Sequence, residues 1–307
     1  MITSNYFANK TFLIIGMGLT GKSLAAALSK SKAKIFHWDD NLQAEKKLKK
    51  VNSKKFSNKI DDWNKIDYVL PSPGIVVNGK FQHNLINLAK EYKKKIISEL
   101  DLFQIAISEY KKTSNGSIKI IAVTGTNGKS TIVSLIHHLL KSKQINSSLI
   151  GNIGNSIFHS KVIKDGFYII EVSSYQLELS KIFAPNIAVI SNLSNDHLNR
   201  HKNIKNYMKQ KSKIFQNLDI TDTAILNCNH SLIKTKVSEL IKLKKSKIIL
   251  FDFKSNIMKT HIIKKNLYTK RKIKKIIHNN NALKGFHNEE NIQIAFKVLE
   301  CLGVKKK

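Results

Sequence analysis

Short apolar runs alternate with amphipathic stretches along most of this chain. Thr11–Ile15 and Ala33–His37 have the pattern of buried strands, and Lys22–Ser31 between them has the pattern of a helix. Further along, Asp67–Ile75 predicts a strand that breaks into a Pro/Gly loop. Strands that alternate with helices are typical of a parallel, doubly wound α/β sheet.

The alternation continues up to a polar, turn-rich segment, K-K-T-S-N-G-S at Lys111–Ser117. Before it, the pattern predicts a helix, a strand and a second helix over Asn84–Tyr92, Lys95–Ser98 and Glu99–Tyr110. The turn-rich segment is the best candidate for a linker. We therefore expect a Rossmann-like parallel-sheet domain, a linker and a second α/β domain at residues 1–110, 111–117 and 118–307.

The second domain repeats the same alternation. Its predicted strands lie at Lys119–Val123, Phe167–Val172, Ile187–Ser191 and Thr223–Leu226. A long helix is expected over Ile204–Asn217, and a last helix from about Asn288. For the Lys/Ile-rich stretch Lys234–Lys275 we expect short strands and turns.

Composition favours a folded protein of a reducing compartment. Hydrophobic residues make up 42% of the 307 residues, which is enough for real cores. No apolar run is long enough to cross a bilayer, and the glycines and Lys22 near the start argue against a signal peptide. Cys228 and Cys301 form no metal or redox pattern. We expect a cytoplasmic protein with no membrane partner.

The formal net charge of +32 permits two interpretations. It fits a protein that binds nucleic acid or an anionic membrane. It also fits a coding sequence rich in A and T, because Lys, Ile and Asn are abundant together. Only Arg200 and Arg271 are arginine, the residue that nucleic-acid readers prefer for bidentate contacts. We favour the compositional interpretation and expect no nucleic-acid partner.

A first glycine-rich loop, G-M-G-L-T-G at Gly16–Gly21, lies between a predicted strand and a predicted helix. Such glycines allow the backbone to approach a diphosphate at the N-terminus of a helix, and Asp39 after the next strand could hold a ribose or a base. The motif alone fits a dinucleotide, another nucleotide diphosphate or a turn without ligand. Because a second phosphate loop follows, we favour a nucleotide-linked substrate here and a triphosphate in the second domain.

The second loop, T-G-T-N-G-K-S-T at Thr124–Thr131, is close to a P-loop. The usual pattern has Gly where this chain has Val123. The working parts are present, because backbone N–H groups can wrap the phosphates, Lys129 can neutralise their charge and Ser130 can bind Mg²⁺. We expect ATP to bind here.

One carboxylate and one histidine follow later strands of the same domain. Glu171 ends the strand of I-I-E-V-S-S-Y-Q-L-E-L, at the edge of the sheet where ligands gather, and is a candidate Mg²⁺ ligand or a salt-bridged residue. His197, in N-L-S-N-D-H-L-N-R-H, is a candidate for a second metal ligand or a packing residue.

Together these motifs resemble the Mur ligases of peptidoglycan synthesis, most closely the members that add D-glutamate. The resemblance rests on T-G-T-N-G-K-S-T, on E-V-S-S-Y-Q-L-E, on N-L-S-N-D-H-L-N-R-H, and on three further segments that occur in family order, S-P-G at Ser72–Gly74, G-N-I-G at Gly151–Gly154 and G-F-H-N-E-E-N at Gly285–Asn291. Folylpolyglutamate synthase shares the loop but explains neither S-S-Y-Q-L-E nor the first domain.

The resemblance implies an ATP-dependent acid–amino-acid ligase, acting as a monomer. In this family ATP phosphorylates the carboxylate of UDP-N-acetylmuramoyl-L-alanine, and the amine of D-glutamate attacks the acyl phosphate. Two Mg²⁺ ions and Lys129 would bring the anions together.

The resemblance also implies a role for each matching residue. The UDP-sugar would be bound by Gly18, Leu19, Thr20, Asp39, Ser72, Pro73, Gly74, Asn152, Ser173 and Gln176. ATP would be bound by Gly125, Thr126, Asn127, Gly128, Lys129, Ser130, Thr131, Asn288 and Asn291. The metal ligands would be Ser130, Glu171, His197 and Lys211, and the catalytic residues Lys129, His197 and Lys211.

Lys211 matches the family lysine that CO₂ converts to a carbamate. A protonated amine cannot bind Mg²⁺, whereas a carbamate is an anionic oxygen ligand. Lys209 and Lys213 compete for this register, and the spacing from Tyr207 favours Lys211.

The family has a third, C-terminal domain that binds D-glutamate, and this sequence stops just after the adenine-contacting motif. We therefore expect a fragment, a truncated reading frame or one half of a split enzyme. The alternative functions are a module that binds a nucleotide or UDP-sugar without turnover, and a nucleic-acid binder.

Overall fold

The structure is a computed structural model that describes residues 1–41, 43, 52–228, 230, 232–233, 247–251 and 285–304. The chain divides into two compact units, which are described separately. The first contains Met1–Ser117, Gly154–Lys164 and Tyr175–Phe183, and the second contains Ile118–Ile153, Asp165–Ser174 and Ala184–Lys307. The predicted division at residues 111–117 stays a prediction, and α5 extends to Thr113 inside that segment.

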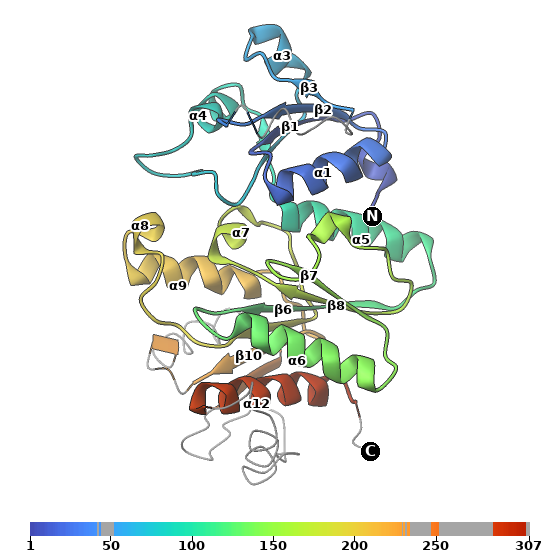
Figure 1. The fold of residues 1–307 in the computed structure, drawn as a ribbon, viewed down its shortest axis with the longest axis vertical. Helices are drawn as coiled ribbons and strands as arrows, with labels where there is room; N and C mark the ends of the chain where they lie inside the picture. The colour runs from blue at the N-terminus through green and yellow to red at the C-terminus, as the bar shows by residue number, and fades with distance from the viewer. Residues whose placement is uncertain are drawn as a thin grey trace. The chain divides into compact units, whose positions relative to one another are not determined.

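The first unit contains a parallel sheet in the order β3-β2-β1-β4-β5 (Figure 1). Its strands are β1 (Thr11–Ile15), β2 (Lys34–Trp38), β3 (Lys54–Lys55), β4 (Tyr68–Pro71) and β5 (Lys95–Ile96). Its helices are η1 (Asn5–Phe7), α1 (Leu19–Lys30), α3 (Ile60–Lys65), α4 (Asn84–Glu91), α5 (Glu99–Thr113) and η2 (Ile157–His159). The order places β1 next to both β2 and β4, so the chain reverses its direction of winding at β1.

The core of the first unit explains why β1 is apolar on both faces. All five residues of β1 are buried. Leu13 and Ile15 belong to a cluster that α3 and α4 cover with Trp63, Leu85 and Ile86. A strand buried on both faces is expected to be a continuous hydrophobic run, as it is here.

The second unit contains a parallel sheet in the order β11-β10-β9-β6-β8-β7. Its strands are β6 (Ile118–Thr124), β7 (Ser147–Gly151), β8 (Gly166–Glu171), β9 (Ile187–Ile190), β10 (Thr223–Asn227) and β11 (Lys247–Phe251). Its helices are α6 (Lys129–Ser142), α8 (Leu198–His201), α9 (Ile204–Ser212), η3 (Lys213–Phe215) and α12 (Phe286–Cys301). A further helix, α7 (Ser174–Leu179), has its first residue, Ser174, in this unit and its other residues in the first unit.

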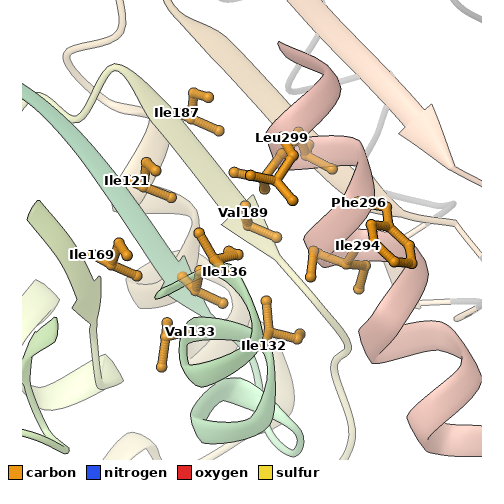
Figure 2. Close-up of a cluster of buried hydrophobic side chains, with 14 of the residues drawn as sticks. Ile121, Ile132, Val133, Ile136, Ile169, Ile187, Val189, Ile294, Phe296 and Leu299 are labelled. Carbon is orange, nitrogen blue, oxygen red and sulfur yellow. The ribbon is translucent and has the colours of Figure 1, made fainter. Parts of the chain in front are cut away.

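Helices α6 and α12 pack side by side on the second sheet (Figure 1). Figure 2 shows the apolar side chains of α6 facing the strands, with those of α12 beside them. The labelled members are Ile121, Ile132, Val133, Ile136, Ile169, Ile187, Val189, Ile294, Phe296 and Leu299. This core packs both helices against the same sheet.

Several predicted boundaries differ from the structure. The helix after the first glycine loop begins at Leu19 rather than Lys22, so Leu19 and Thr20 belong to its first turn. Gly21 lies inside this helix, where a Cβ atom would meet the Gly16 carbonyl oxygen at 2.0 Å. Only glycine allows the helix to start this close to the loop.

Other differences are also local. The helix predicted over Ile204–Asn217 ends at Ser212 and continues as η3, and the last helix begins at Phe286. Strand β7 was not predicted, because S-S-L-I-G is short and carries serines. Most of Lys234–Lys275 lies outside the described residues. None of the described helices is long and apolar enough to span a bilayer.

Candidate functional site

The second glycine loop joins β6 to α6 at the centre of its sheet. Gly128 caps α6 with a left-handed backbone, at φ +76°. Lys129, Ser130 and Thr131 then form the first turn of the helix. Backbone N–H groups in a first turn have no partner within the helix, and with the helix dipole they form an anion-binding site. The loop therefore has the backbone geometry that phosphate binding requires.

Ser130 and Glu171 bring two oxygen ligands together beside this loop. The Ser130 hydroxyl donates to Glu171 Oε2 at 2.8 Å, and Asn152 Nδ2 donates to Glu171 Oε1 at 3.1 Å. Glu171 is only 1% exposed. Two neighbouring ligands of an octahedral Mg²⁺ lie about 3 Å apart, since each metal–oxygen bond is about 2.1 Å. The hydroxyl and the carboxylate therefore fit one Mg²⁺ ion.

A metal site made only of acids, histidines and cysteines is absent from the part of the chain that the structure describes. No group of three or more such side chains lies close enough there to hold a metal ion. Any cation at the glycine loop would need the hydroxyl of Ser130, phosphate oxygens or a modified side chain as further ligands.

Lys129 and Lys211 both bind carbonyl oxygens of the glycine loop. Lys129 Nζ donates to Thr126 O at 2.8 Å, and Lys211 Nζ donates to Gly125 O at 2.8 Å and to Thr124 Oγ1 at 3.3 Å. Burial is the main cause that lowers the pKa of both amines. For Lys211 the charge of Lys129 adds to it, and the pKa falls to about 7.

Lys211 differs sharply from the two lysines that competed for its register. Its side chain is 2% exposed, although it carries an amine. Lys209 is exposed and Lys213 is half-buried. Of these three lysines, therefore, only Lys211 is enclosed beside the glycine loop.

His197 lies on the surface near the same place. It precedes α8 as its N-cap with a left-handed backbone, its side chain is 47% exposed, and its Nε2 lies 3.3 Å from Asp196 Oδ2. Tyr207 connects it to the loop, because its ring lies 6.3 Å from the His197 ring and its hydroxyl 3.3 Å from Thr126 Oγ1. Lys211 Nζ lies over the same Tyr207 ring at 4.7 Å.

Asn288 lies in the first turn of α12 and Asn291 in the second, and both are buried. Asn291 Nδ2 donates to Asn288 Oδ1 at 3.1 Å. Asn291 also lies against the glycine loop, because a Cβ atom on Gly128 would come within 2.4 Å of Asn291 Oδ1. The structure thus brings these two asparagines to the loop from a position more than 150 residues later in the sequence.

Two of the predicted substrate-binding residues, Asp39 and Ser72, hydrogen bond to the backbone of the first glycine loop. Asp39 accepts from Met17 N at 2.5 Å and from Asn41 N at 2.8 Å. Ser72 Oγ donates to Gly16 O at 2.6 Å. Leu19 is largely exposed, as are Gly18 and Gly74, and Thr20 and Pro73 are half-buried. All of these residues follow β1, β2 or β4, where the winding of the sheet reverses and ligands commonly bind.

Ser173 and Gln176 lie on different units, although they are three residues apart. Gln176 is buried in the first unit, where its Nε2 donates to Glu99 Oε2 at 3.4 Å. Burial raises the pKa of Glu99 to about 7. Glu99 was not singled out from the sequence, because an acid in the first turn of a helix is usually exposed to solvent.

Asn192 was also missed. It follows β9 and hydrogen bonds to three backbone groups of the glycine loop. The only signal in the sequence was its place in N-L-S-N-D-H, directly after a strand of the same sheet.

The comparisons with known proteins agree with this geometry. The family described as Mur ligase middle domain matches residues 123–299, which contain the glycine loop, Glu171, Lys211 and both asparagines of α12. The chain belongs to the Mur ligase family.

Relatives cover nearly all of this Mur ligase. UDP-N-acetylmuramoylalanine--D-glutamate ligase of Rickettsia bellii is 34% identical over 299 residues, covering 95% of this chain and 63% of the relative. The protein of the same name from Rickettsia prowazekii is 32% identical over 308 residues, covering 99% of this chain and 65% of the relative. The chain thus spans less than two thirds of the length of these relatives.

Solved structures support the fold of this Mur ligase. The UDP-N-acetylmuramate:L-alanyl-gamma-D-glutamyl-meso-diaminopimelate ligase from Neisseria meningitides matches with a TM-score of 0.58 and 16% identity, over 97% of this chain and 95% of that chain. A UDP-N-acetylmuramoyl-L-alanyl-D-glutamate--2,6-diaminopimelate ligase matches with a TM-score of 0.51 and 19% identity, over 99% of this chain and 59% of that chain. The α/β fold expected from the sequence is confirmed.

Proposed function

We propose that this chain serves the ATP-dependent joining of D-glutamate to UDP-N-acetylmuramoyl-L-alanine in peptidoglycan synthesis. The names of the relatives point to this reaction. The observation that carries the proposal is the hydrogen bond from Ser130 Oγ to Glu171 Oε2, 2.8 Å long, beside a glycine loop whose carbonyl oxygens also bind two lysine amines. A site of this kind suits the transfer of a phosphoryl group between anions.

ATP would lie on the second unit. The N–H groups of the first turn of α6 would bind its phosphates, and Lys129 would leave Thr126 O to neutralise their charge. The loop residues Gly125 to Gly128 would surround them. Asn291, which lies beside Gly128, and Asn288, which accepts a hydrogen bond from it, would contact the adenine.

The UDP-sugar would use the N-terminus of α1 on the first unit. The first-turn N–H groups of α1 after Gly18 would bind the diphosphate, beside the side chains of Leu19 and Thr20. Asp39 and the segment Ser72–Gly74 follow neighbouring strands and would contact the uridine side. The muramoyl-alanine end would be contacted by Asn152, Ser173, Gln176 and His197.

The chemistry would proceed in two displacements. An oxygen of the substrate carboxylate attacks the γ-phosphorus, the bond to the bridging oxygen breaks, and ADP leaves with that electron pair. The amine of D-glutamate then attacks the acyl carbon, the C–O bond to phosphate breaks, and the amine proton goes to solvent. Lys129 would lower the repulsion between the carboxylate and the γ-phosphate.

Bound Mg²⁺ would supply positive charge at the phosphate oxygens. Ser130 and Glu171 would hold one ion, and His197 with a modified Lys211 would hold a second. The amine of Lys211 does not itself fit a cation, whereas a carbamate on Nζ does. Because its pKa is about 7, a large fraction of the amine is neutral at neutral pH, and only the neutral amine can react with CO₂, releasing a proton.

Calorimetric titration of the purified chain tests the proposal. We expect UDP-N-acetylmuramoyl-L-alanine and Mg-ADP each to bind, because each unit has its own anion site. Lys129→Ala should weaken Mg-ADP binding by about 10-fold to 100-fold, the cost of one charge-assisted contact. Lys119→Ala is the matched control, since it removes the same charge from an exposed position of β6 and should change nothing. Absence of UDP-sugar binding at high micromolar concentration would contradict the proposal.

A further inference from the structure

Asn192 is a candidate for an additional functional residue, because its side chain hydrogen bonds to the backbone of the glycine loop. Its Oδ1 accepts from Thr126 N at 3.1 Å and from Asn127 N at 2.8 Å. Its Nδ2 donates to Asn127 O at 2.8 Å. Its own carbonyl oxygen accepts from Thr126 N at 3.1 Å. One side chain thus satisfies three polar groups of the loop backbone.

These bonds decide which N–H groups remain for phosphate. Those of Thr126 and Asn127 are turned toward Asn192 and are already paired. The donors left to a ligand include those that follow the left-handed Gly128, in the first turn of α6. By holding the peptides before Gly128, Asn192 fixes the backbone that leads into the first turn of α6.

The chemistry of the amide explains why this position suits asparagine. The side chain must accept from two N–H groups and donate to a carbonyl oxygen at the same time. An aspartate would keep both accepting bonds, lose the donor and place a negative charge beside the phosphates. An alanine would lose all three bonds.

We propose that Asn192 is a positioning residue for nucleotide binding, which fixes Gly125–Gly128 in the phosphate-accepting conformation before the nucleotide arrives. The inference rests on the proposed function, because it concerns the same loop. It does not make Asn192 a catalytic residue, since its three contacts are to the loop. Pre-organisation of this kind lowers the ordering cost that binding would otherwise include.

A merely stabilising role is the competing explanation, and the chain contains a matched control for it. Asn186 lies just before β9, as Asn192 lies just after it, and both are half-buried. Asn186 Oδ1 accepts from Ile120 N at 2.9 Å, and its Nδ2 donates to Asp222 Oδ1 at 3.1 Å. It therefore joins strands of the same sheet at the edge opposite the glycine loop.

The experiment compares Asn192→Ala, Asn192→Asp and Asn186→Ala with the unmodified chain. Calorimetry gives Kd for Mg-ADP and for UDP-N-acetylmuramoyl-L-alanine, and thermal unfolding gives Tm. We expect both Asn192 variants to weaken Mg-ADP binding by about 10-fold or more, with the UDP-sugar Kd unchanged. Asn186→Ala should lower Tm without changing Kd for Mg-ADP.

Amide hydrogen exchange supplies a second measurement. In Asn192→Ala the amide of Asn127 should exchange faster, because its acceptor is gone, whereas the amide of Thr126 keeps the main-chain carbonyl oxygen of residue 192 as an acceptor. Asn186→Ala should leave both amides protected. If Asn192→Ala lowers Tm so far that it cannot be titrated, the Asn192→Asp result decides. Equal losses of Mg-ADP affinity in Asn192 and Asn186 variants, or none in either, would overturn the inference. Failure of the unmodified chain to bind Mg-ADP would instead overturn the proposed function, and this inference with it.

Discussion

Glu99 carries a carboxyl group that is buried at the first turn of α5. Gln176 Nε2 donates to one of its oxygens, and the other, Oε1, has no hydrogen-bond partner among the described residues. Burial raises its pKa to about 7, and the hydrogen bond from Gln176 opposes the shift without cancelling it. Because its pKa is raised, this buried acid changes the stability of the fold in a pH range where exposed acids do not titrate.

We expect the folded chain to lose stability through Glu99 as the pH rises. The ordinary pKa is 4.5 and the folded-state pKa about 7, so the folded state binds this proton more tightly than the unfolded state. The contribution is fully present below pH 4.5 and is lost as the pH rises through 7. The side chain in Glu99→Gln does not titrate, so its contribution to stability does not change with pH. The free energy of unfolding of Glu99→Gln minus that of the unmodified chain should therefore be larger at pH 8 than at pH 4, by on the order of 3 kcal/mol.

Urea unfolding of both proteins at several pH values checks this. The difference between the two curves isolates Glu99, because other groups, including Lys211, titrate in both proteins. Curves that stay parallel between pH 4 and pH 8 would show that Glu99 is not the cause.

At the scale of elements, helix α5 anchors a segment that lies far from it in sequence. Asp101 in its first turn is buried and accepts hydrogen bonds from Ser180 Oγ at 3.0 Å and from three consecutive backbone N–H groups. These are the N–H groups of Lys181, Ile182 and Phe183, at 3.0, 3.0 and 3.2 Å. One carboxylate therefore holds the chain where α7 ends and the following turn begins.

Asp101→Ala should be strongly destabilising, by on the order of 3 kcal/mol, because it leaves buried donors without an acceptor. Asp101→Asn keeps one acceptor oxygen and should cost less. Asp61→Ala is the control, since Asp61 is an exposed acid in the first turn of α3 and should stay within about 0.5 kcal/mol. Chemical denaturation measures all three, and an Asp101→Ala variant as stable as Asp61→Ala would refute this account.

At the scale of the molecule, the two units each have a sheet and a buried cluster of their own. The glycine loop that follows β6 belongs to the second unit, and the loop that follows β1 belongs to the first. A ligand that binds a single unit therefore stabilises the native state of that unit directly.

We expect calorimetric unfolding to show two transitions. Mg-ADP at about 100 times its Kd should contribute about 2.7 kcal/mol to the second unit and raise one transition by several degrees, leaving the other in place. At the same Mg-ADP concentration, Lys129→Ala should reduce this contribution to between about 0.4 and about 1.4 kcal/mol, and Lys119→Ala should preserve it. A single transition, or an equal shift of both, would mean that the units unfold together.

Features that depend on neighbouring residues could be predicted from the amino-acid sequence alone. The strand, glycine loop and helix around Gly128 follow from spacing and backbone preferences, as do the alternation of strands with helices and the apolar run of β1. These are local properties, since each residue acts on others within a few positions. The family could also be inferred, because its motifs are short continuous segments.

Which distant side chains act on the glycine loop depends instead on how the chain folds. The order β9-β6-β8 places Asn192 and Glu171 beside it, and the packing of α12 on α6 brings Asn291 against Gly128. Burial likewise distinguishes Lys211 from Lys209 and gives Glu99 its raised pKa. Removal from water depends on everything that surrounds a group, and that environment is assembled from the whole chain rather than from its neighbours in sequence.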